Sequence, residues 1–254
     1  MAGKNAIKRA SFLEGHRRIL LKISGEVLGE GGEGIFSKQR FAAMAEDILF
    51  MGRQGVDIVV VVGGGNIVRG RDIHALGIET QGVGDDMGML ATILNGMLLQ
   101  AFIQERGGQA VVMSALSMER MCQPYERDKA RKCLCDGQVV ILVGGIGQPF
   151  FTTDTTAALR SLELECSLML KGTKVDGVYD KDPVGDRSAT HYPTLTYRDV
   201  IEKKLHVLDE TAMTLMQGRG KSVIVFNIRH GGIRAMIEGT QRYSHICDVV
   251  TTCA

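Results

Sequence analysis

The chain has 254 residues, with 30 Lys and Arg against 29 Asp and Glu, so its net charge at pH 7 is only +1. A chain of this length can bury one sizeable core, as one domain or as two tightly joined lobes. The balanced charge argues against a general nucleic-acid-binding surface. No apolar run approaches the roughly 18 residues of a membrane span, and residues 1–18 lack the apolar core of a signal peptide. We therefore expect a cytoplasmic protein with no membrane and no nucleic-acid partner.

The strand and helix patterns alternate through the first two thirds of the chain. Strands are predicted at Ile19–Ile23, Val56–Val62, Ala110–Met113, Val139–Val143 and Ser167–Leu170. Helices are predicted at Lys38 to about Gln54 after an N-cap at Ser37, at Met87–Arg106 with a start near Asp85 and Asp86, at Tyr125–Cys135, and from a cap at Thr152 or Thr153 to about Glu165. This alternation predicts an α/β fold with a mainly parallel sheet and helices on both faces.

After Lys171 the pattern changes to a turn-rich stretch that continues to about Pro193. Beyond it, helices are predicted at Thr196–Lys203, Asp209–Gly218 and Gly232–Glu238, and strands at Val223–Asn227 and Asp248–Thr251. We divide the chain into an N-terminal extension, 1–17, and a domain, 18–254. Its N-terminal lobe runs from 18 to about 165 and its C-terminal lobe from about 166 to 254.

The six cysteines show no metal-binding pattern. Only Cys133 and Cys135 lie close together, in a Cys-x-Cys within a predicted helix, and no histidine pair has zinc-finger spacing. Reduced, mostly packed thiols are the expected state. The histidines are scattered, and we assign none of them a catalytic role. The sequence thus predicts no metal site built from protein side chains.

Three predicted strands end in glycines, at Ser24-Gly25, Gly63-Gly64-Gly65 and Gly144-Gly145-Ile146-Gly147. Parallel sheets bind ligands at the carboxyl ends of their strands, and glycines let backbone N–H groups approach an anion, so these runs indicate a phosphate-rich ligand. None of them matches a familiar phosphate loop. Gly220-Lys221-Ser222 lacks the first glycine of a Walker loop, the dinucleotide fingerprint fails at both glycine runs, and the protein-kinase motifs are missing.

Two lysines and one aspartate are the candidates for chemistry. Lys22 interrupts an apolar strand and Lys171 stands at the end of another, so both could grip a polyphosphate and neutralise charge that develops during transfer. A solvent-facing lysine on an edge strand is the alternative for Lys22. Asp154, at a helix start, could hold the two lysines in register or meet a nucleotide-bound metal. The alternative is a helix N-terminal acid favoured by the helix dipole.

Several polar residues could bind the ligand directly. Arg69 could bind a phosphate bidentately or be a solvated loop arginine, and Asp85 could accept from ribose hydroxyls or cap a helix. Thr152 and Thr153 offer hydroxyl and N–H groups to an anion at a helix start. No carboxylate cluster has ligand spacing, so Mg²⁺ would arrive held mainly by nucleotide phosphates.

These segments together resemble the amino-acid kinase family, and within it closely the bacterial-type UMP kinases. The resemblance runs from about Arg18 to Thr251. The matching segments are Leu21–Glu26, Gly63–Asn66 with Arg69-Gly70, Val83–Thr92, Pro149–Asp154, and Lys171–Tyr179 with Asp182-Pro183. The segments Gly84–Thr92 and Pro149–Asp154 are the specific ones, because family members that phosphorylate amino-acid carboxylates or carbamate differ there.

The resemblance implies a three-layer αβα sandwich of the amino-acid kinase fold. It implies transfer of the ATP γ-phosphoryl group to UMP in pyrimidine nucleotide biosynthesis, giving UDP and ADP, with Mg²⁺ carried by ATP. Lys22, Asp154 and Lys171 would act by positioning and charge stabilisation, without a phospho-enzyme. The ATP contacts implied are Lys22, Ile23, Ser24, Gly25, Gly65 and Arg69, joined by Thr173, Tyr179 and Asp182 from the C-terminal lobe. The UMP contacts implied, from the N-terminal lobe, are Gly64, Asp85, Ile146, Gly147, Gln148, Pro149, Phe150, Phe151, Thr152 and Thr153.

The family is typically a homohexamer, and many members are activated by GTP and inhibited by UTP. The segment that resembles the one linked to GTP comprises Glu30, Gly31, Gly32, Glu33, Gly34 and Ile35. Gln100 and Gln104 occupy helix positions where some relatives carry basic residues, so we predict weak or altered GTP activation. Ile146 and Gln148 replace the usual Thr and Asn, and Asp86 replaces a common His. Side-chain contacts of Ile146 and Gln148 to uracil are therefore left open.

Two other functions remain to be compared with this one. One is an amino-acid or carbamate kinase of the same fold, in which an acyl phosphate forms; the segment Pro149–Asp154 argues against it. The other is a catalytically silent nucleotide-binding regulator, and the presence of Lys22, Lys171 and Asp154 argues against that.

Overall fold

The computed structural model describes residues 11–29, 34–69, 73, 75–77, 80–229 and 232–249. Within these residues the strands are β1 (Arg18–Ile23), β2 (Asp57–Val62), β3 (Ala110–Ser114), β4 (Gln123–Pro124), β5 (Val139–Val143), β6 (Leu168–Thr173), β7 (Val178–Tyr179), β8 (His191–Tyr192), β9 (Thr194–Thr196), β10 (Ser222–Asn227) and β11 (Tyr243–Cys247). The helical elements are η1 (Ser11–Leu13), α1 (Gly25–Gly29), α2 (Lys38–Arg53), α4 (Gln81–Gln104), α5 (Arg127–Cys135), α6 (Thr153–Glu163), α7 (Tyr197–Glu202), α8 (Glu210–Met216) and α9 (Gly232–Ile237).

One sheet runs through the described part of the chain, in the order β4-β3-β5-β2-β1-β6-β10-β11-β9. The neighbouring strands are parallel except for β10 and β11, which are antiparallel. Strand β1 lies in the middle and pairs directly with β6, so the sheet crosses the expected lobe boundary near residue 165 without a break. The predicted α/β class with a mainly parallel sheet is confirmed.

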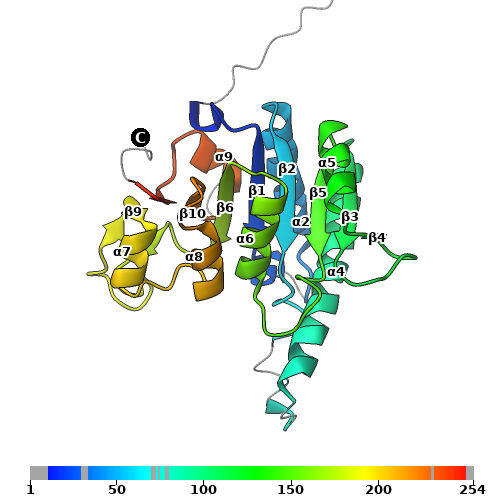
Figure 1. The fold of residues 1–254 in the computed structure, drawn as a ribbon, viewed down its shortest axis with the longest axis horizontal. Coiled ribbons are helices and arrows are strands. Elements are labelled where there is room, and N and C mark those ends of the chain that lie inside the picture. The colour runs from blue at the N-terminus through cyan, green and yellow to red at the C-terminus, as the bar shows by residue number, and fades with distance from the viewer. Residues whose placement is uncertain are drawn as a thin grey trace, which may run out of the picture.

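Helices cover both faces of this sheet and complete the three-layer αβα arrangement (Figure 1). Alternate residues of each strand point to opposite faces, so Ile19, Leu21 and Ile23 of β1 enter a core with α2, α4 and α9. Leu20 of the same strand enters the core on the other face, with α5, α6, α7 and α8. The strands are buried on both faces, which explains why they are continuous apolar runs.

Helix α4 begins earlier than the sequence predicts. It starts at Gln81 after an extended Thr80, so Asp85 and Asp86 lie inside the helix and not at its start. The glycines Gly82 and Gly84, which normally disfavour a helix, explain the misplaced boundary. By length and apolar composition the stretch Gly82–Gln104 could also cross a membrane. Its packing against β3, β5 and α2 identifies it as a core helix.

Several C-terminal and connecting elements also differ from the prediction. The predicted strand Asp248–Thr251 is wrong at its described end: β11 ends at Cys247, and the Asp248 carboxylate accepts the Gly218 and Gly220 N–H groups in the turn before β10. Residues 250 and 251 lie outside the described part.

Helix α5 starts at Arg127, not Tyr125, because Gln123–Pro124 pairs with β3 as β4. The turn-rich stretch contains the β7–β8 hairpin.

The cysteines divide into two groups. Cys122, Cys133, Cys135 and Cys166 are free, as expected for reduced thiols. Cys247 is disulfide-bonded, so the expectation of a reduced thiol is wrong for that residue.

Candidate active site

Lys22, Lys171 and Asp154 form one buried ionic cluster, as the sequence suggests. Lys22 and Lys171 are in-register partners on the parallel strands β1 and β6 and project from the same face of the sheet. Thr152 caps α6 by accepting the Asp154 and Thr155 N–H groups, which places Asp154 in the first helical turn above both lysines. Asp154 Oδ1 lies 2.9 Å from Lys22 Nζ, and Asp154 Oδ2 lies 2.5 Å from Lys171 Nζ.

The burial of these three side chains settles two of the open alternatives. They are only 12%, 13% and 15% exposed, for Lys22, Lys171 and Asp154 respectively. Strand β1 is central, so Lys22 is not a solvent-facing lysine on an edge strand. Asp154 does occupy a helix start, but its carboxylate also bridges both ammonium groups, so the structural and the ionic roles coexist.

The three charges influence one another strongly. Burial alone would raise the pKa of Asp154, but the positive charges of Lys22 and Lys171 hold it below its ordinary value. Burial lowers the pKa of Lys171, the charge of Asp154 opposes that change, and Lys22 adds to it. The cluster is therefore a concentrated positive site with one resident carboxylate, suited to an incoming polyanion.

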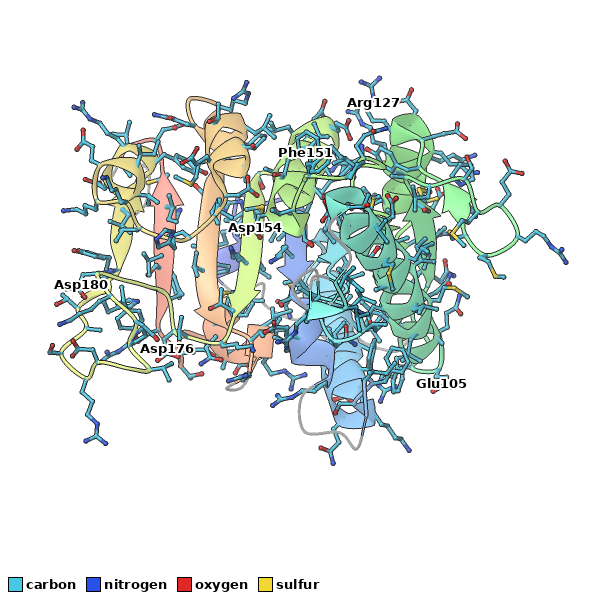
Figure 2. All side chains as sticks on the ribbon, turned by 90° about the horizontal axis from the view of Figure 1, so that it is seen from below. Glu105, Arg127, Phe151, Asp154, Asp176 and Asp180 are labelled. Atoms are coloured by element: carbon cyan, nitrogen blue, oxygen red, sulfur yellow. The ribbon has the colours of Figure 1, made fainter. Side chains whose placement is uncertain are left out.

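Asp209 links this cluster to the C-terminal lobe, a role that the sequence did not reveal beyond a predicted helix start. Its carboxylate caps α8 by accepting the Ala212 N–H, and it also accepts the Thr155 N–H and hydroxyl and the Thr152 hydroxyl. One side chain thus holds the N-terminal ends of α6 and α8 together. The Lys171 ammonium group donates to the carbonyl of Val207, which lies two residues before Asp209 in the chain. Figure 2 shows Asp154 near the middle of the molecule, with Asp176 and Asp180 on the side of the C-terminal lobe.

The triple glycine is a site of close backbone packing. A Cβ on Gly64 would lie 2.7 Å from the Ala91 Cβ and the Gly88 carbonyl oxygen of α4. A Cβ on Gly25 would lie 2.5 Å from the Gly65 nitrogen. The loops after β1 and β2 therefore touch each other and α4, which explains why side chains are excluded from these positions.

A cavity of about 250 Å³ lies on the N-terminal-lobe side of the cluster. We call it the acceptor cavity. Of the residues predicted to bind UMP, those that line it are Gly64, Asp85, Gln148, Phe151, Thr152 and Thr153. Ile146, Gly147, Pro149 and Phe150 are not among its lining residues. Gly65, which the sequence assigns to ATP, also lines it.

Asp85 has a contact that neither sequence-based alternative anticipates. Its carboxylate accepts the Phe150 N–H at 2.8 Å, so it holds the loop that precedes α6 and does not cap α4. Phe150 has a positive φ of 72° and its ring is largely exposed. Asp85 thus fixes one wall of the acceptor cavity while it also lines that cavity.

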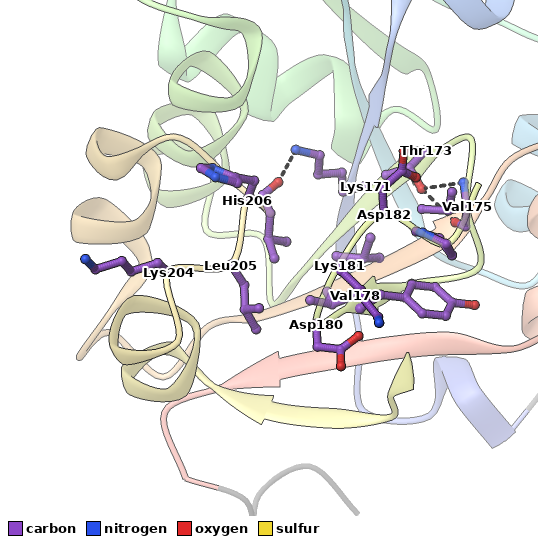
Figure 3. A pocket seen from close by; sticks show the side chains of 15 residues that line it. Lys171, Thr173, Val175, Val178, Asp180, Lys181, Asp182, Lys204, Leu205 and His206 are labelled. Atoms are coloured by element: carbon purple, nitrogen blue, oxygen red, sulfur yellow. Dashed lines mark hydrogen bonds between the residues drawn. The ribbon is translucent and has the colours of Figure 1, made fainter. Parts of the chain in front are cut away.

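A second cavity, of about 390 Å³, lies on the C-terminal-lobe side (Figure 3). We call it the donor cavity. Lys171 and the predicted ATP residues Thr173, Tyr179 and Asp182 line it. Sequence reasoning missed the segment 204–207, which lines the opposite wall and whose only signal was its place between two predicted helices. The other residues predicted to bind ATP, Lys22, Ile23, Ser24, Gly25, Gly65 and Arg69, are not among its lining residues.

Arg69 is engaged by the protein itself. Its Nε donates to the Gly65 carbonyl at 3.0 Å, and its Nη2 lies 3.1 Å from Glu26 Oε1. Lys174 lies 2.5 Å from the other oxygen of Glu26. Arg69 is therefore not a solvated loop arginine.

In the segment that resembles a GTP site, residues 30–33 lie outside the described part, whereas Gly34 and Ile35 are exposed.

Lys171 lines the donor cavity, and Thr153, next to Asp154, lines the acceptor cavity. A buried cationic cluster beside two cavities can stabilise a charged group that is transferred between two ligands. Residues 17–227 match the model of the amino acid kinase family. The chain belongs to this family.

Its relatives within the family are consistent with the resemblance seen in the sequence. It is 44% identical over 225 residues to a uridylate kinase of Magnetococcus marinus, covering 88% of this chain and 92% of that protein. It is 43% identical to a uridylate kinase of Haemophilus influenzae, covering 91% and 98%. The fold matches the crystal structure of UMP kinase from Ureaplasma parvum with a TM-score of 0.87 at 33% identity, covering 91% and 99%. It matches UMP kinase from Bacillus anthracis with a TM-score of 0.86 at 32% identity, covering 92% and 96%.

Proposed function

We propose that this chain is a UMP kinase that transfers the γ-phosphoryl group of ATP to UMP, giving UDP and ADP in pyrimidine nucleotide biosynthesis. The observation that carries the proposal is the Lys22–Asp154–Lys171 cluster between two cavities. The names of the relatives support UMP as the acceptor, and ATP as the donor is the substrate that the sequence resemblance implies. UMP would occupy the acceptor cavity and ATP the donor cavity.

In the proposed reaction an oxygen of the UMP phosphate attacks the γ-phosphorus of ATP. The bond from that phosphorus to the β–γ bridging oxygen breaks, and ADP leaves with the electron pair. Lys22 and Lys171 would stabilise the charge on the transferring group, while Asp154 holds the two ammonium groups at fixed positions. Both oxygens of Asp154 are engaged by lysines, so no carboxylate of the cluster is free to become a phospho-enzyme. Direct transfer by alignment and electrostatics is therefore the mechanism we propose.

Mg²⁺ would enter with ATP. Within the described residues no group of three His, Cys, Asp or Glu side chains is placed to hold a metal ion. Asp180 and Asp182, which both line the donor cavity, are the carboxylates on this side available to the phosphate-bound ion. When bound, Mg²⁺ would neutralise phosphate charge and would not need a ligand set of its own in the protein.

We also propose that the protein is a cytoplasmic homohexamer that UTP inhibits and that GTP activates only weakly or in an altered way. The support for subunit contact is an apolar stripe on the exposed side of α4, at helical spacing, formed by Val83, Met87, Leu90 and Leu94. Native mass spectrometry measures the assembly directly, and a monomer at micromolar concentration would contradict this part of the proposal.

The test of the proposed function is an acceptor panel. Purified protein with Mg-ATP is offered UMP, CMP, aspartate, glutamate and carbamate, and ADP release is followed by a coupled assay. We expect rapid ADP release with UMP only. Release with an amino acid or carbamate would instead identify an acyl- or carbamoyl-phosphate-forming kinase. Binding of UMP without formation of UDP would identify a silent nucleotide-binding regulator.

A further inference from the structure

The central part of α4 carries a buried amide that reaches out of the helix. Asn95 is fully buried, at 0% exposure, in a helix whose other inward residues are mostly apolar or small. Its Nδ2 donates to the Gly63 carbonyl at 2.8 Å and to Asn66 Oδ1 at 2.7 Å. Burying an amide costs desolvation free energy, which an apolar side chain of similar size would not cost. What the amide supplies, and an apolar side chain could not, is its set of directed hydrogen bonds.

Asn66 completes a reciprocal pair with this residue. Its Nδ2 lies 3.1 Å from Asn95 Oδ1 and donates at 2.7 Å to the carbonyl of Ile35. Asn66 also lies under α1, where a Cβ on Gly25 would come within 2.8 Å of its Oδ1 and a Cβ on Gly29 within 3.0 Å of its Cβ. The two amides thus join three separate segments: α4, the loop after β2, and the chain just before α2.

The same face of α4 also holds the end of β5, the third glycine-ended strand. One turn before Asn95, the Thr92 hydroxyl accepts the N–H of Gly144, at the end of β5, at 2.7 Å. Thr92 lines the acceptor cavity. Neither Asn66 nor Asn95 is among the residues that line the donor or the acceptor cavity. Any effect of the amide pair on the reaction must therefore pass through the backbone that it holds.

We propose that Asn66 and Asn95 are a positioning pair for phosphoryl transfer, fixing the Gly63–Gly65 backbone between the two nucleotides and tying it to the segment at Ile35. This inference rests on the proposed UMP kinase function. Gly64 and Gly65 line the acceptor cavity, and Gly25 at the end of β1 touches Gly65. A small shift of this loop would misalign the reacting phosphates, and a misplacement of about 1 Å can cost about a hundredfold in rate.

The test compares Asn95→Leu and the milder Asn66→Ser with the control Gln100→Leu. Gln100 is a good match because it lies on the same helix and its amide donates to a backbone carbonyl, that of Ala110, at 2.9 Å, away from both cavities. We expect kcat to fall about tenfold or more in both asparagine variants, with KM for UMP and ATP changed less than about threefold. The control should keep its kcat.

A second measurement separates positioning from general loss of structure. Hydrogen exchange of a peptide covering residues 63–69 should speed up in both asparagine variants and stay unchanged in Gln100→Leu. The double variant Asn66→Ser with Asn95→Leu should be no slower than the worse single variant by more than about threefold, because the pair acts as one unit. Independent, multiplicative losses would overturn the pairing.

The outcomes also distinguish this inference from the proposed function. A wild-type protein that forms no UDP would refute the function, and exchange at 63–69 would then decide whether the pair holds the loop. An active wild type with unchanged kcat in a folded Asn66→Ser variant would overturn the inference alone. Loss of activity in the control as large as in Asn95→Leu would also overturn it.

Discussion

Lys22 and Lys171 are direct in-register partners on adjacent parallel strands, and their ammonium groups contact the two oxygens of one carboxylate, Asp154. Two like charges on one face of a sheet repel each other, so the carboxylate between them is what allows both to remain buried. The arrangement holds a pair of cations at the edge of the donor cavity, which Lys171 lines, and close to the acceptor cavity, which Thr153 next to Asp154 lines. Its consequences for rate and pH dependence can be tested directly.

Asp154→Asn should lower kcat about a hundredfold while weakening UMP binding much less. The neutral amide cannot balance both lysines, so their positions at the transferring group are lost, whereas the acceptor cavity keeps its lining. Steady-state kinetics and calorimetric titration with UMP measure the two effects, with circular dichroism to confirm folding. Asp199→Asn, in the capping box of α7, is the control. An unchanged kcat would remove Asp154 from the mechanism.

The rate should also fall at alkaline pH. Burial lowers the pKa of Lys171 below its ordinary 10.5, with Asp154 opposing and Lys22 reinforcing the shift, so the ammonium group is lost earlier as pH rises. We expect kcat to decline as pH rises through a value below 10.5. The Lys171→Arg variant keeps its positive charge throughout this pH range. Its kcat should be lower than that of the wild type but should not fall as pH rises. The same decline in the variant would show that another group titrates.

The contact between α2 and α9 should make stability depend on pH. Burial raises the pKa of Asp47 to about 6, although the Ile233 N–H that it accepts at 2.8 Å and the charge of Arg234 lower it. A carboxyl whose pKa is raised on folding contributes stability below about 4, and this contribution is lost as pH rises through about 6. Asp47→Asn should therefore raise the free energy of unfolding at pH 8 by up to about 3 kcal/mol and have little effect at pH 4. Urea titrations at the two pH values test this, and equal effects at both would contradict it.

Activation by GTP should be weak, less than about twofold. The Gln100 amide, which stands where some relatives carry a basic residue, is neutral and already donates to the Ala110 carbonyl. A neutral, engaged amide contributes little to binding a triphosphate. Rates with and without GTP at subsaturating ATP decide the matter, and a tenfold increase would show that other residues bind the activator.

The cluster was predictable because its geometry follows from local rules. Strand alternation places Lys22 and Leu20 on one face, and a threonine before an acid predicts the capped start of α6 that carries Asp154. The parallel sheet followed from the alternation of strands and helices. The glycine runs indicated the ligand side of that sheet, and both cavities lie near it.

The rest depends on contacts between residues far apart in the chain. The local sequence around Asp209 predicts only a helix cap. Nothing local shows that its carboxylate also accepts the hydroxyls of Thr152 and Thr155 at the start of α6, more than 50 residues earlier in the chain. From the sequence, Asn66 is a loop residue and Asn95 a helix residue, with nothing to link them. Their reciprocal hydrogen bonds exist only in the folded chain. Helix α4 starts early although Gly82 and Gly84 disfavour it, because tertiary packing outweighs local propensity.

The most direct test of the proposed mechanism is a rapid-quench reaction with γ-labelled ATP. We expect label to move from ATP into UDP when UMP is present, with none on the protein when UMP is left out, and the transfer to slow about a hundredfold in Asp154→Asn. Label retained on the protein, or UMP bound with no labelled UDP formed, would contradict direct transfer between the two cavities.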